Sequence, residues 1–232
     1  MTYGRIIYEI LSLFYPNVCP GCGSLLLRDE DTVCLACQAL LPRTGYENDA
    51  NNPLARMFYG RMPFKAVAAV FFFAKQGKVQ HIIHSLKYHH NAEAGIFLGK
   101  EMGKALKDAP LFRDADYLIP IPLHPKRQRV RGYNQSEMIA RGISEITGIE
   151  VSTRHLLRSV NTATQTKKTR QERWDNVRDI FMLSNDDELK DKYVIIIDDV
   201  LTTGATLESC GKILASISGI TISALTAACA GG

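Results

Sequence analysis

The sequence predicts an α/β protein: a parallel β-sheet flanked by helices, preceded by a small four-cysteine module. From residue 61 onward, strand-like apolar runs alternate with helical patterns, which is the order typical of parallel sheets. One run, residues 194–197, is apolar without interruption, as in strands that are buried on both faces. Four cysteines between residues 19 and 37 indicate the front module.

The predicted elements follow from the spacing of apolar residues along 61–232. Expected strands cover 65–73, 117–122 and 194–197, and expected helices cover 79–88, 93–107, 136–147 and 207–217. Asn134 and Glu137 are positioned to cap the helix at 136–147. Strands that alternate with helices are joined by crossovers, so we expect them to pair in parallel.

Residues 1–45 precede this alternation and form a separate predicted domain. They contain the cysteines and an amphipathic pattern at 5–15, which is too little to form a core without a metal ion. Residues 46–60 are rich in Asn and Asp, as is typical of a linker. We therefore predict a zinc-binding module at 1–45, a linker at 46–60 and a second domain at 61–232.

The overall composition argues against a disordered or membrane-spanning chain. Of 232 residues, 46% are hydrophobic and 22% are charged, which is ordinary for a globular protein. The longest apolar run, 66–74, is too short to span a bilayer, and no small-residue cleavage site follows the N-terminal apolar run. We expect a cytoplasmic location, with the inner face of the membrane as the alternative.

An acidic pair, Asp198 and Asp199, follows the apolar strand at 194–197. The carboxyl ends of such strands are where open α/β sheets bind ligands. The polar turn T-T-G-A-T at 202–206 leads into the next helix, so its N–H groups, its hydroxyls and the helix dipole meet at a point that suits a phosphate. Gly204 lets an anion approach the backbone. Because carboxylates accept hydrogen bonds from sugar hydroxyls or approach a divalent cation, the predicted ligand is a sugar phosphate with free hydroxyls.

The string D-D-V-L-T-T-G-A-T behind an apolar strand resembles the 5-phosphoribosyl-1-pyrophosphate (PRPP) binding motif of type I phosphoribosyltransferases. The resemblance implies a type I phosphoribosyltransferase-like fold, in which the two acids contact the ribose hydroxyls and the turn surrounds the 5-phosphate. It also implies Mg²⁺ as the ion that accompanies PRPP. The residues to which it assigns PRPP binding are Asp198, Asp199, Val200, Leu201, Thr202, Thr203, Gly204, Ala205 and Thr206.

Two segments concentrate positive charge. Residues 124–134 carry four basic residues and no acid, and residues 158–178 carry six bases against two acids. The first follows the strand at 117–122 and opens on the same sheet edge as the acidic pair, where its arginines and lysine can neutralise a pyrophosphate, the leaving group of PRPP. The second resembles the mobile flap that closes over the ligand in type I enzymes. Its alternative is a solvated helix with alternating charges.

Four of the six cysteines have the spacing C-x2-C-x11-C-x2-C. Paired C-x2-C knuckles place four thiolates at the corners of a tetrahedron, the geometry that zinc takes in closed structural sites. Disulfides are the alternative, and the lack of a secretory signal disfavours them. We predict structural Zn²⁺, since four thiolates leave no open position for a substrate. The predicted ligands are Cys19, Cys22, Cys34 and Cys37, whereas Cys210 and Cys229 are expected in the core.

Five features, in order along nearly the whole chain, are similar to the ComF family of competence and DNA-uptake proteins, also called the ComF/GntX group. They are the four-cysteine module and the strings S-L-K-Y-H-H-N, P-I-P-L-H-P-K-R-Q-R-V-R-G-Y-N-Q, R-Q-E-R-W-D-N-V-R-D-I-F and I-I-I-D-D-V-L-T-T-G-A-T. The resemblance assigns catalysis to Asp198, Asp199, Arg170 and Arg173. It assigns pyrophosphate binding to Lys87, His124, Lys126, Arg127, Arg131, Asn134 and Gln135.

Two functional hypotheses follow. The first is an enzyme, a phosphoribosyltransferase that binds Mg-PRPP and transfers the phosphoribosyl group to an unidentified acceptor with release of pyrophosphate. The second is a non-enzymatic component of DNA uptake that binds PRPP or a nucleotide and contacts single-stranded DNA or partner proteins. The role in DNA uptake is implied by the family resemblance alone. Release of pyrophosphate distinguishes the two hypotheses.

Overall fold

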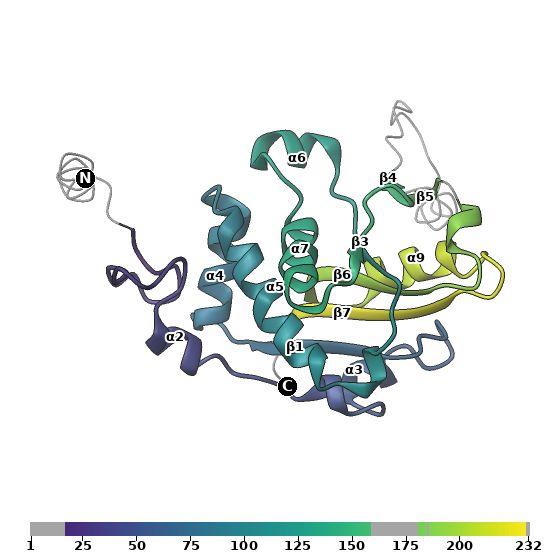
Figure 1. Ribbon diagram of the computed structural model, residues 1–232, viewed down its shortest axis with the longest axis horizontal. Coiled ribbons are helices and arrows are strands. Elements are labelled where there is room, and N and C mark those ends of the chain that lie inside the picture. The colour runs from purple at the N-terminus through teal and green to yellow at the C-terminus, as the bar shows by residue number, and fades with distance from the viewer. Residues whose placement is uncertain (1–16, 159–180, 185, 231–232) are drawn as a thin grey trace, which may run out of the picture.

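The computed structural model describes residues 17–158, 181–184 and 186–230 of the 232-residue chain. Its centre is a five-stranded parallel sheet with the strand order β1-β7-β6-β2-β3 (Figure 1). The strands are β1 (Val67–Phe73), β2 (Tyr117–Pro120), β3 (Glu150–Val151), β6 (Tyr193–Leu201) and β7 (Thr221–Ala230). The predicted α/β class and the parallel pairing are confirmed.

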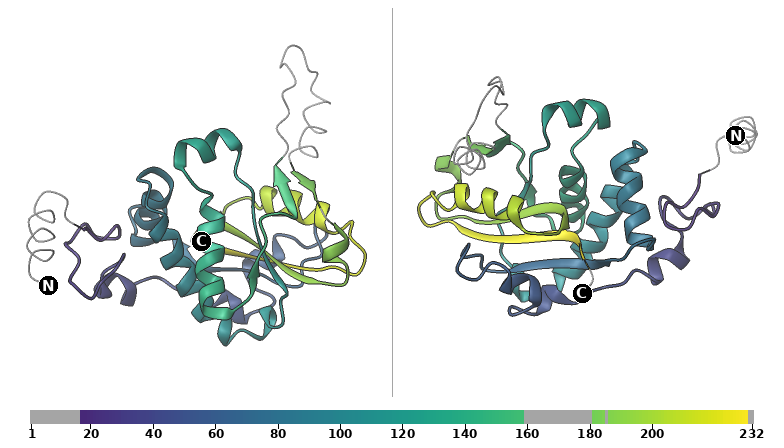
Figure 2. Two further views of the ribbon diagram at one scale, coloured as in Figure 1. Left: turned by 45° about the horizontal axis from the view of Figure 1, so that its top comes forward. Right: turned by 180° about the vertical axis from the view of Figure 1, so that it is seen from behind.

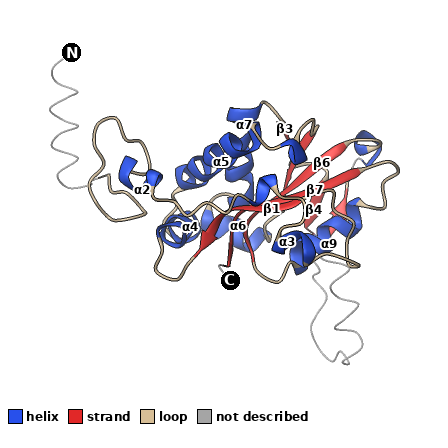
Figure 3. Ribbon diagram, turned by 90° about the horizontal axis from the view of Figure 1, so that it is seen from below, coloured by secondary structure: helices blue, strands red, loops and turns tan. Residues whose placement is uncertain are grey.

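Helices cover both faces of the sheet (Figure 3). They are α4 (Lys78–Tyr88), α5 (Ala92–Lys107) and α7 (Gln135–Thr147) on one face, and α3 (Pro53–Arg56) and α9 (Ala205–Leu214) on the other. Side chains of the central strand β6 alternate between the two layers: Ile195 and Ile197 join the first, and Val194 and Ile196 join the second. Strand β6 is therefore buried on both faces, as its unbroken apolar run predicts.

Helices α5 and α7 approach each other closely at two glycines. A Cβ atom on Gly99 would lie 2.1 Å from the carbonyl oxygen of Ile139, and one on Gly142 would lie 2.2 Å from that of Ile96. No larger residue fits at either position without moving the helix backbones apart. This packing fixes the axis of α7, whose first turn reaches the carboxyl end of β6.

The basic segment 124–134, expected as a loop, contains a short helix. This is α6 (Pro125–Arg131), which has no buried residue and stands above the sheet in Figure 1. His124 caps its first turn by accepting a hydrogen bond from the N–H group of Lys126, and Gly132, with φ at 83°, ends it. The helix lacks an apolar face, so apolar periodicity could not reveal it.

A separate two-stranded antiparallel sheet of β4 (Leu156–Arg158) and β5 (Phe181–Leu183) packs in the same core layer as α9. A buried histidine holds its base: His155 Nδ1 lies 2.6 Å from Ser152 Oγ, and its Nε2 lies 3.1 Å from Glu188 Oε2. The predicted flap and its alternative helix both fall mainly on residues 159–180, which lie outside the described residues.

The ends of most elements differ from the expectation by one to four residues, and two of these elements, β6 and α9, adjoin the acidic pair and the turn. Strand β6 continues through the acidic pair to Leu201, because Asp198 and Val200 still pair with Thr226 and Ala228 of β7. Helix α9 begins two residues earlier than expected and ends at residue 214 instead of 217. The acidic pair is therefore held by a sheet ladder, which restricts its backbone more than a loop would.

The predicted cap of α7 is half correct. Asn134 Oδ1 accepts a hydrogen bond from the N–H group of Ser136 at 3.1 Å, as an N-cap residue does. The prediction that Glu137 completes the cap is wrong. Its Oε1 lies 2.7 Å from Nη2 of Arg141, one helical turn onward, and this i,i+4 ion pair takes the carboxylate away from the helix start.

The four-cysteine module lies beside α4 at one end of the molecule in each view, drawn in purple (Figures 1 and 2). It contains one short helix, α2 (Leu35–Ala39). The helix expected at 5–15 falls outside the described residues. Among the residues that the structure describes, no helix has the length and apolar character needed to cross a membrane.

The segment 46–60, expected as a linker, packs against the sheet. It contains α3 and a short 3-10 helix, η1 (Tyr46–Asn48). Asn52 is 1% exposed; its Nδ2 donates to the carbonyl oxygen of Val67 at 2.8 Å, and its Oδ1 caps α3. Phe58 belongs to the core beneath α9. Asn52 is thus a buried N-cap residue of α3 and does not mark a flexible linker. The predicted domain boundaries at residues 45 and 60 stay a prediction.

Candidate functional site

The acidic pair receives contacts from the first turn of α7 and the last turn of α4. Ser136 Oγ donates a hydrogen bond to Asp198 Oδ1 at 3.0 Å. Lys87 Nζ lies 2.9 Å from Oδ1 and 2.8 Å from Oδ2 of Asp199. Both carboxylates are partly exposed. The pair therefore faces solvent at the carboxyl edge of the sheet, as predicted, with one lysine as its counter-charge.

Asp198 has an unusual charge state for a carboxylic acid. Its pKa is raised to about 7, first because surrounding protein atoms disfavour the charged form and second because the charge of Asp199 repels it. The N–H group of Asp199, the Ser136 hydroxyl and Lys87 favour the charged form and oppose the shift. A partly exposed carboxyl group whose pKa is raised by burial and a like charge is typical of a binding or catalytic site.

The T-T-G-A-T turn connects β6 to the ten-residue helix α9. Its threonine and alanine residues at 202, 203, 205 and 206 are exposed, so their N–H groups and hydroxyls lie at the surface beside the positive end of the helix dipole. Gly204 has φ at 77°, and a Cβ atom there would lie 2.6 Å from Cζ of Phe58. The structure therefore explains this glycine by its backbone conformation and by the close approach of a core phenylalanine. The approach of an anion to Gly204 stays a prediction.

A basic pocket with a cavity volume of about 530 Å³ lies between the end of α4 and α6. Lys87 lines it and also pairs with Asp199, so the pocket is continuous with the acidic pair. A concave surface with four basic side chains attracts anions. The residues that line this basic pocket are Lys87, Tyr88, His90, Lys126, Arg127, Val130 and Arg131.

The structure brings together four of the seven residues to which the resemblance assigns pyrophosphate binding, and the other three do not line the pocket. His124 caps α6, and Asn134 donates from Nδ2 to the carbonyl oxygen of Ile121 at 2.9 Å. Gln135 is 2% exposed; its Oε1 accepts from Arg131 Nη1 at 2.7 Å, and its Nε2 has no partner among the described residues. These three side chains shape the segment around the pocket.

Of the other predicted site residues, two pack in or against the core and two lie outside the residues that the structure describes. Leu201 is 3% exposed and Val200 packs against the core, so their side chains face away from a ligand. Arg170 and Arg173, the predicted catalytic arginines, lie outside the described residues. Their roles stay predictions.

Several residues that sequence reasoning did not select belong to this site. Ser136 contacts Asp198, and Tyr88, His90 and Val130 line the basic pocket. Ser136 could have been found from its place just after the N-cap of α7, since hydroxyls in a first helical turn face the open end of the helix. The other three lie within the strings that carry the family resemblance, but no local pattern predicts that the end of α4 and α6 come together to form the pocket.

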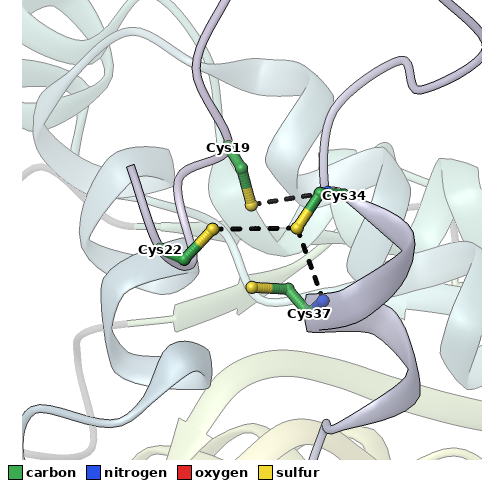
Figure 4. Close-up of side chains that lie close together, drawn as sticks. All are labelled: Cys19, Cys22, Cys34 and Cys37. Atoms are coloured by element: carbon green, nitrogen blue, oxygen red, sulfur yellow. Dashed lines mark hydrogen bonds between the residues drawn. The ribbon is translucent and has the colours of Figure 1, made fainter. Parts of the chain in front are cut away.

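The four predicted zinc ligands converge in the front module (Figure 4). Their sulfur atoms all lie within 4.8 Å of one another, and Cys22 Sγ lies 3.7 Å from Cys34 Sγ. Tetrahedral zinc with Zn–S distances of about 2.3 Å requires sulfur atoms about 3.8 Å apart, whereas a disulfide requires about 2.05 Å. The N–H groups of Cys34 and Cys37 each donate to a cysteine sulfur at 3.4 Å, as in metal-bound thiolates. The cluster can hold a metal ion such as zinc.

Curated proteins related to the chain were identified by sequence, although no family model matches it. "DNA utilization protein YhgH" of Escherichia coli (strain K12) is 26% identical over 208 residues, which cover 88% of this chain and 86% of that protein. "Competence protein F" of Haemophilus influenzae is 34% identical over 98 residues, 42% of this chain and 43% of that one. "Competence protein ComFC" of Bacillus subtilis is 31% identical over 111 residues, 45% of this chain and 43% of that one. These findings support the resemblance of the chain to the ComF family.

Two of the solved structures with some likeness to this chain carry names that refer to PRPP or to a phosphoribosyltransferase. Glutamine PRPP amidotransferase from B. subtilis, complexed with ADP and GMP, has a TM-score of 0.42 and 17% identity over 62% of this chain and 30% of its own. A hypoxanthine phosphoribosyltransferase from Staphylococcus aureus has a TM-score of 0.36 and 19% identity, over 58% and 62% of the two chains. These scores are low. The phosphoribosyltransferase-like fold of the chain is seen in its own parallel sheet, with the acidic pair and the T-T-G-A-T turn at the carboxyl end of a central strand.

Proposed function

We propose that the chain binds Mg-PRPP between the acidic pair, the T-T-G-A-T turn and the basic pocket, and transfers its phosphoribosyl group to an unidentified acceptor. The observation that carries this proposal is the position of Lys87. Its Nζ lies 2.8 Å from Asp199 while its side chain lines the basic pocket. PRPP requires this adjacency, because its pyrophosphate is attached to C1 of the ribose, next to C2, and C2 and C3 carry the free hydroxyl groups.

Each part of PRPP has a matching group of residues in this proposal. The turn at 202–206 and the start of α9 suit the 5-phosphate. Asp198 and Asp199 suit the ribose hydroxyls, and Lys126, Arg127 and Arg131 suit the pyrophosphate. In the proposed arrangement residues 61–232 form the PRPP-binding domain and residues 1–45 the metal module.

The proposed transfer is a displacement at C1 of the ribose. A bond forms between the acceptor and C1, and the bond between C1 and the pyrophosphate oxygen breaks, its electron pair leaving with the pyrophosphate. The basic side chains stabilise the charge that develops on the leaving group, which lowers the barrier most where water is excluded. When bound, Mg²⁺ would supply further charge neutralisation to the pyrophosphate. Asp198 and Asp199 orient the ribose.

The second candidate is a non-enzymatic component of DNA uptake that binds PRPP or a nucleotide and contacts single-stranded DNA or partner proteins. The observation that favours it is the exposure of α6. No residue of this helix is buried, and its basic side chains include Arg129, which does not line the pocket. An exposed basic helix suits phosphate backbones, and Tyr88, which is 61% exposed, lies beside it.

Pyrophosphate release tests the first candidate against the second. The full chain is incubated with PRPP, Mg²⁺ and pooled nucleobases and amines, and pyrophosphate is measured. The expected result is release that depends on one acceptor and is absent in the double variant Asp198→Asn with Asp199→Asn. Glu145→Gln, which removes an exposed carboxylate at the far end of α7, is the control and should retain release. Binding of PRPP without release from any acceptor would favour the second candidate, and no binding would contradict both.

A further inference from the structure

Helix α4 contacts both the four-cysteine module and the acidic pair. Near its start, His81 Nδ1 lies 3.3 Å from the carbonyl oxygen of Gly21, in the loop between two predicted zinc ligands. In its last turn, Lys87 pairs with Asp199. The two contact points are about 9 Å apart along the helix axis, at about 1.5 Å per residue. One rigid helix therefore joins two regions of the molecule that have separate chemistry.

The contact between His81 and Gly21 depends on how the loop between Cys19 and Cys22 is folded. A Cβ atom on Gly21 would lie 3.1 Å from Cys37 Sγ and 3.6 Å from Cys19 Sγ, so the residue whose carbonyl group meets α4 is packed against two predicted zinc ligands. Cys19 and Cys37 are buried and belong to the same apolar core as Ile82 of α4. A module of this size obtains its folding free energy from metal binding. The surface against which α4 packs therefore depends on the metal.

The other end of α4 holds the basic pocket in shape. The carbonyl oxygen of Leu86 accepts a hydrogen bond from the Tyr133 hydroxyl at 2.6 Å. The guanidinium of Arg131 lies 5.5 Å from the ring centre of Tyr88, a cation–π distance. His90 Nδ1 lies 3.2 Å from the carbonyl oxygen of Arg131. These contacts attach α6 and its arginine to the end of α4, so a shift of α4 changes the pocket.

We propose that the metal-loaded four-cysteine module positions α4 so that Lys87 and Arg131 meet the pyrophosphate of PRPP. This inference rests on the proposed function. It assigns the metal a positioning role at a distance from the ligand, since four thiolates leave the metal no open coordination position. The proposed 5-phosphate turn connects β6 to α9, which packs on the other face of the sheet from α4. Loss of the metal should therefore weaken binding at the pyrophosphate end selectively.

Calorimetric titration of metal-loaded and metal-free full chain tests the inference. Metal is removed with a chelator and, independently, by Cys22→Ser, which replaces the exposed cysteine of the cluster. The affinity for Mg-PRPP should fall about tenfold, the effect of one misplaced charge contact, while the affinity for ribose 5-phosphate changes less than about twofold. The control is Leu25→Ala, which alters a 66% exposed module residue that is not a metal ligand, and should leave both affinities unchanged. Equal weakening of both ligands, or no change in either, would overturn the inference.

Two further measurements separate this inference from general destabilisation and from failure of the proposed function. In Lys87→Met, metal removal should weaken PRPP binding less than in wild type, because the contact that the module positions is already gone.

If wild-type protein does not bind PRPP, the proposed function fails, and hydrogen exchange then decides whether loss of the metal changes the end of α4. The N–H groups of His89 and Gly132, bonded to the carbonyl groups of Ser85 and Gln128, should then exchange faster without metal, while those of β6 and β7 do not. Unchanged exchange at those positions would overturn the coupling itself.

Discussion

Lys87 and Asp199 form an ion pair between the last turn of α4 and the carboxyl end of β6, with the lysine Nζ 2.8 Å from Oδ2 and 2.9 Å from Oδ1. Their side chains are 24% and 14% exposed, so water screens the pair less than a surface ion pair. The lysine supplies one positive charge to two adjacent carboxylates and also lines the basic pocket. It is the residue at which the ribose and pyrophosphate parts of the proposed site meet.

Replacement of this lysine tests whether the ion pair belongs to the ligand site. Lys87→Met keeps most of the side-chain length and removes the charge, so Mg-PRPP affinity should fall about tenfold or more, since hydrogen bonds to charged groups are worth about 1.5 to 3 kcal/mol. The matched control is Lys100→Met, which breaks an exposed ion pair with Glu145 and should leave affinity unchanged. Calorimetry measures both. Equal affinity in Lys87→Met and wild type would remove Lys87 from the proposed site.

Two arginines of α6 provide a test within one short helix. Arg131 lines the basic pocket and Arg129 does not. Arg131→Ala should weaken Mg-PRPP by about tenfold and ribose 5-phosphate little, since the second ligand lacks the pyrophosphate. Arg129→Ala carries the same charge change outside the pocket and should have a small effect on both ligands. If the two variants behaved alike, α6 would act only through its overall charge.

The sequence predicts the sheet well because its central strand is specified by local pattern. Val194 to Ile197 form an unbroken apolar run, and the structure places alternate members of the run in the two layers of the core. Predicting β6 also locates the acidic pair and the turn, since both are adjacent to it in the chain. The four-cysteine cluster is equally predictable, because the spacing of its two C-x2-C pairs along the sequence is typical of tetrahedral zinc sites.

What the sequence does not reveal is contact between distant segments. Lys87 and Asp199 are separated by 112 residues, and no local rule brings them together. Helix α6 has no apolar stripe; its only signals are Pro125 at the start and Gly132 at the end, which pattern analysis treats as turn residues. The close packing of α5 on α7 through Gly99 and Gly142 is likewise a tertiary property.

The acidic pair has a direct test by paired substitution. Asp198→Asn with Asp199→Asn keeps the shape of both side chains but removes their charge, so the sheet should remain folded. Loss of two charge-assisted hydrogen bonds predicts a drop in PRPP affinity of about a hundredfold or more. Calorimetric titration with PRPP and Mg²⁺, together with a melting curve, measures both effects. Unchanged affinity in a folded variant would mean that the acidic pair is structural.

Zinc content tests the front module. Protein purified without chelator should contain one zinc ion per chain by elemental analysis, and Cys34→Ser should lose it and unfold the module while sparing the sheet. Leu35→Ala replaces the neighbouring residue, which is 65% exposed, and should keep the metal. Absence of zinc from the wild-type protein would contradict the prediction.

The raised pKa of Asp198 predicts how stability depends on pH. In the folded chain this pKa is about 7, against an ordinary pKa of 3.8 for an aspartic acid side chain. Between these values the folded state retains a proton that the unfolded state has released, so the contribution of Asp198 to stability is largest at low pH and is lost as pH rises through about 7. Asp198→Asn removes this dependence. The melting temperature of the variant relative to wild type should therefore increase between about pH 5 and about pH 8.

A second carboxylate supplies a control of opposite sign. The pKa of Asp116 is lowered, first by the N–H group of Tyr193, which donates to its Oδ2 at 2.8 Å, and also by Lys192. Its contribution to stability is present above the unfolded pKa and is lost as pH falls through the lowered folded value, so Asp116→Asn should reduce the melting temperature at about pH 8. Opposite shifts of the two variants at this pH would identify the charge on Asp198 as one that opposes folding and is kept for ligand binding, a pattern found at functional sites. If the difference in melting temperature between Asp198→Asn and wild type did not increase from about pH 5 to about pH 8, the raised pKa of Asp198 would be contradicted.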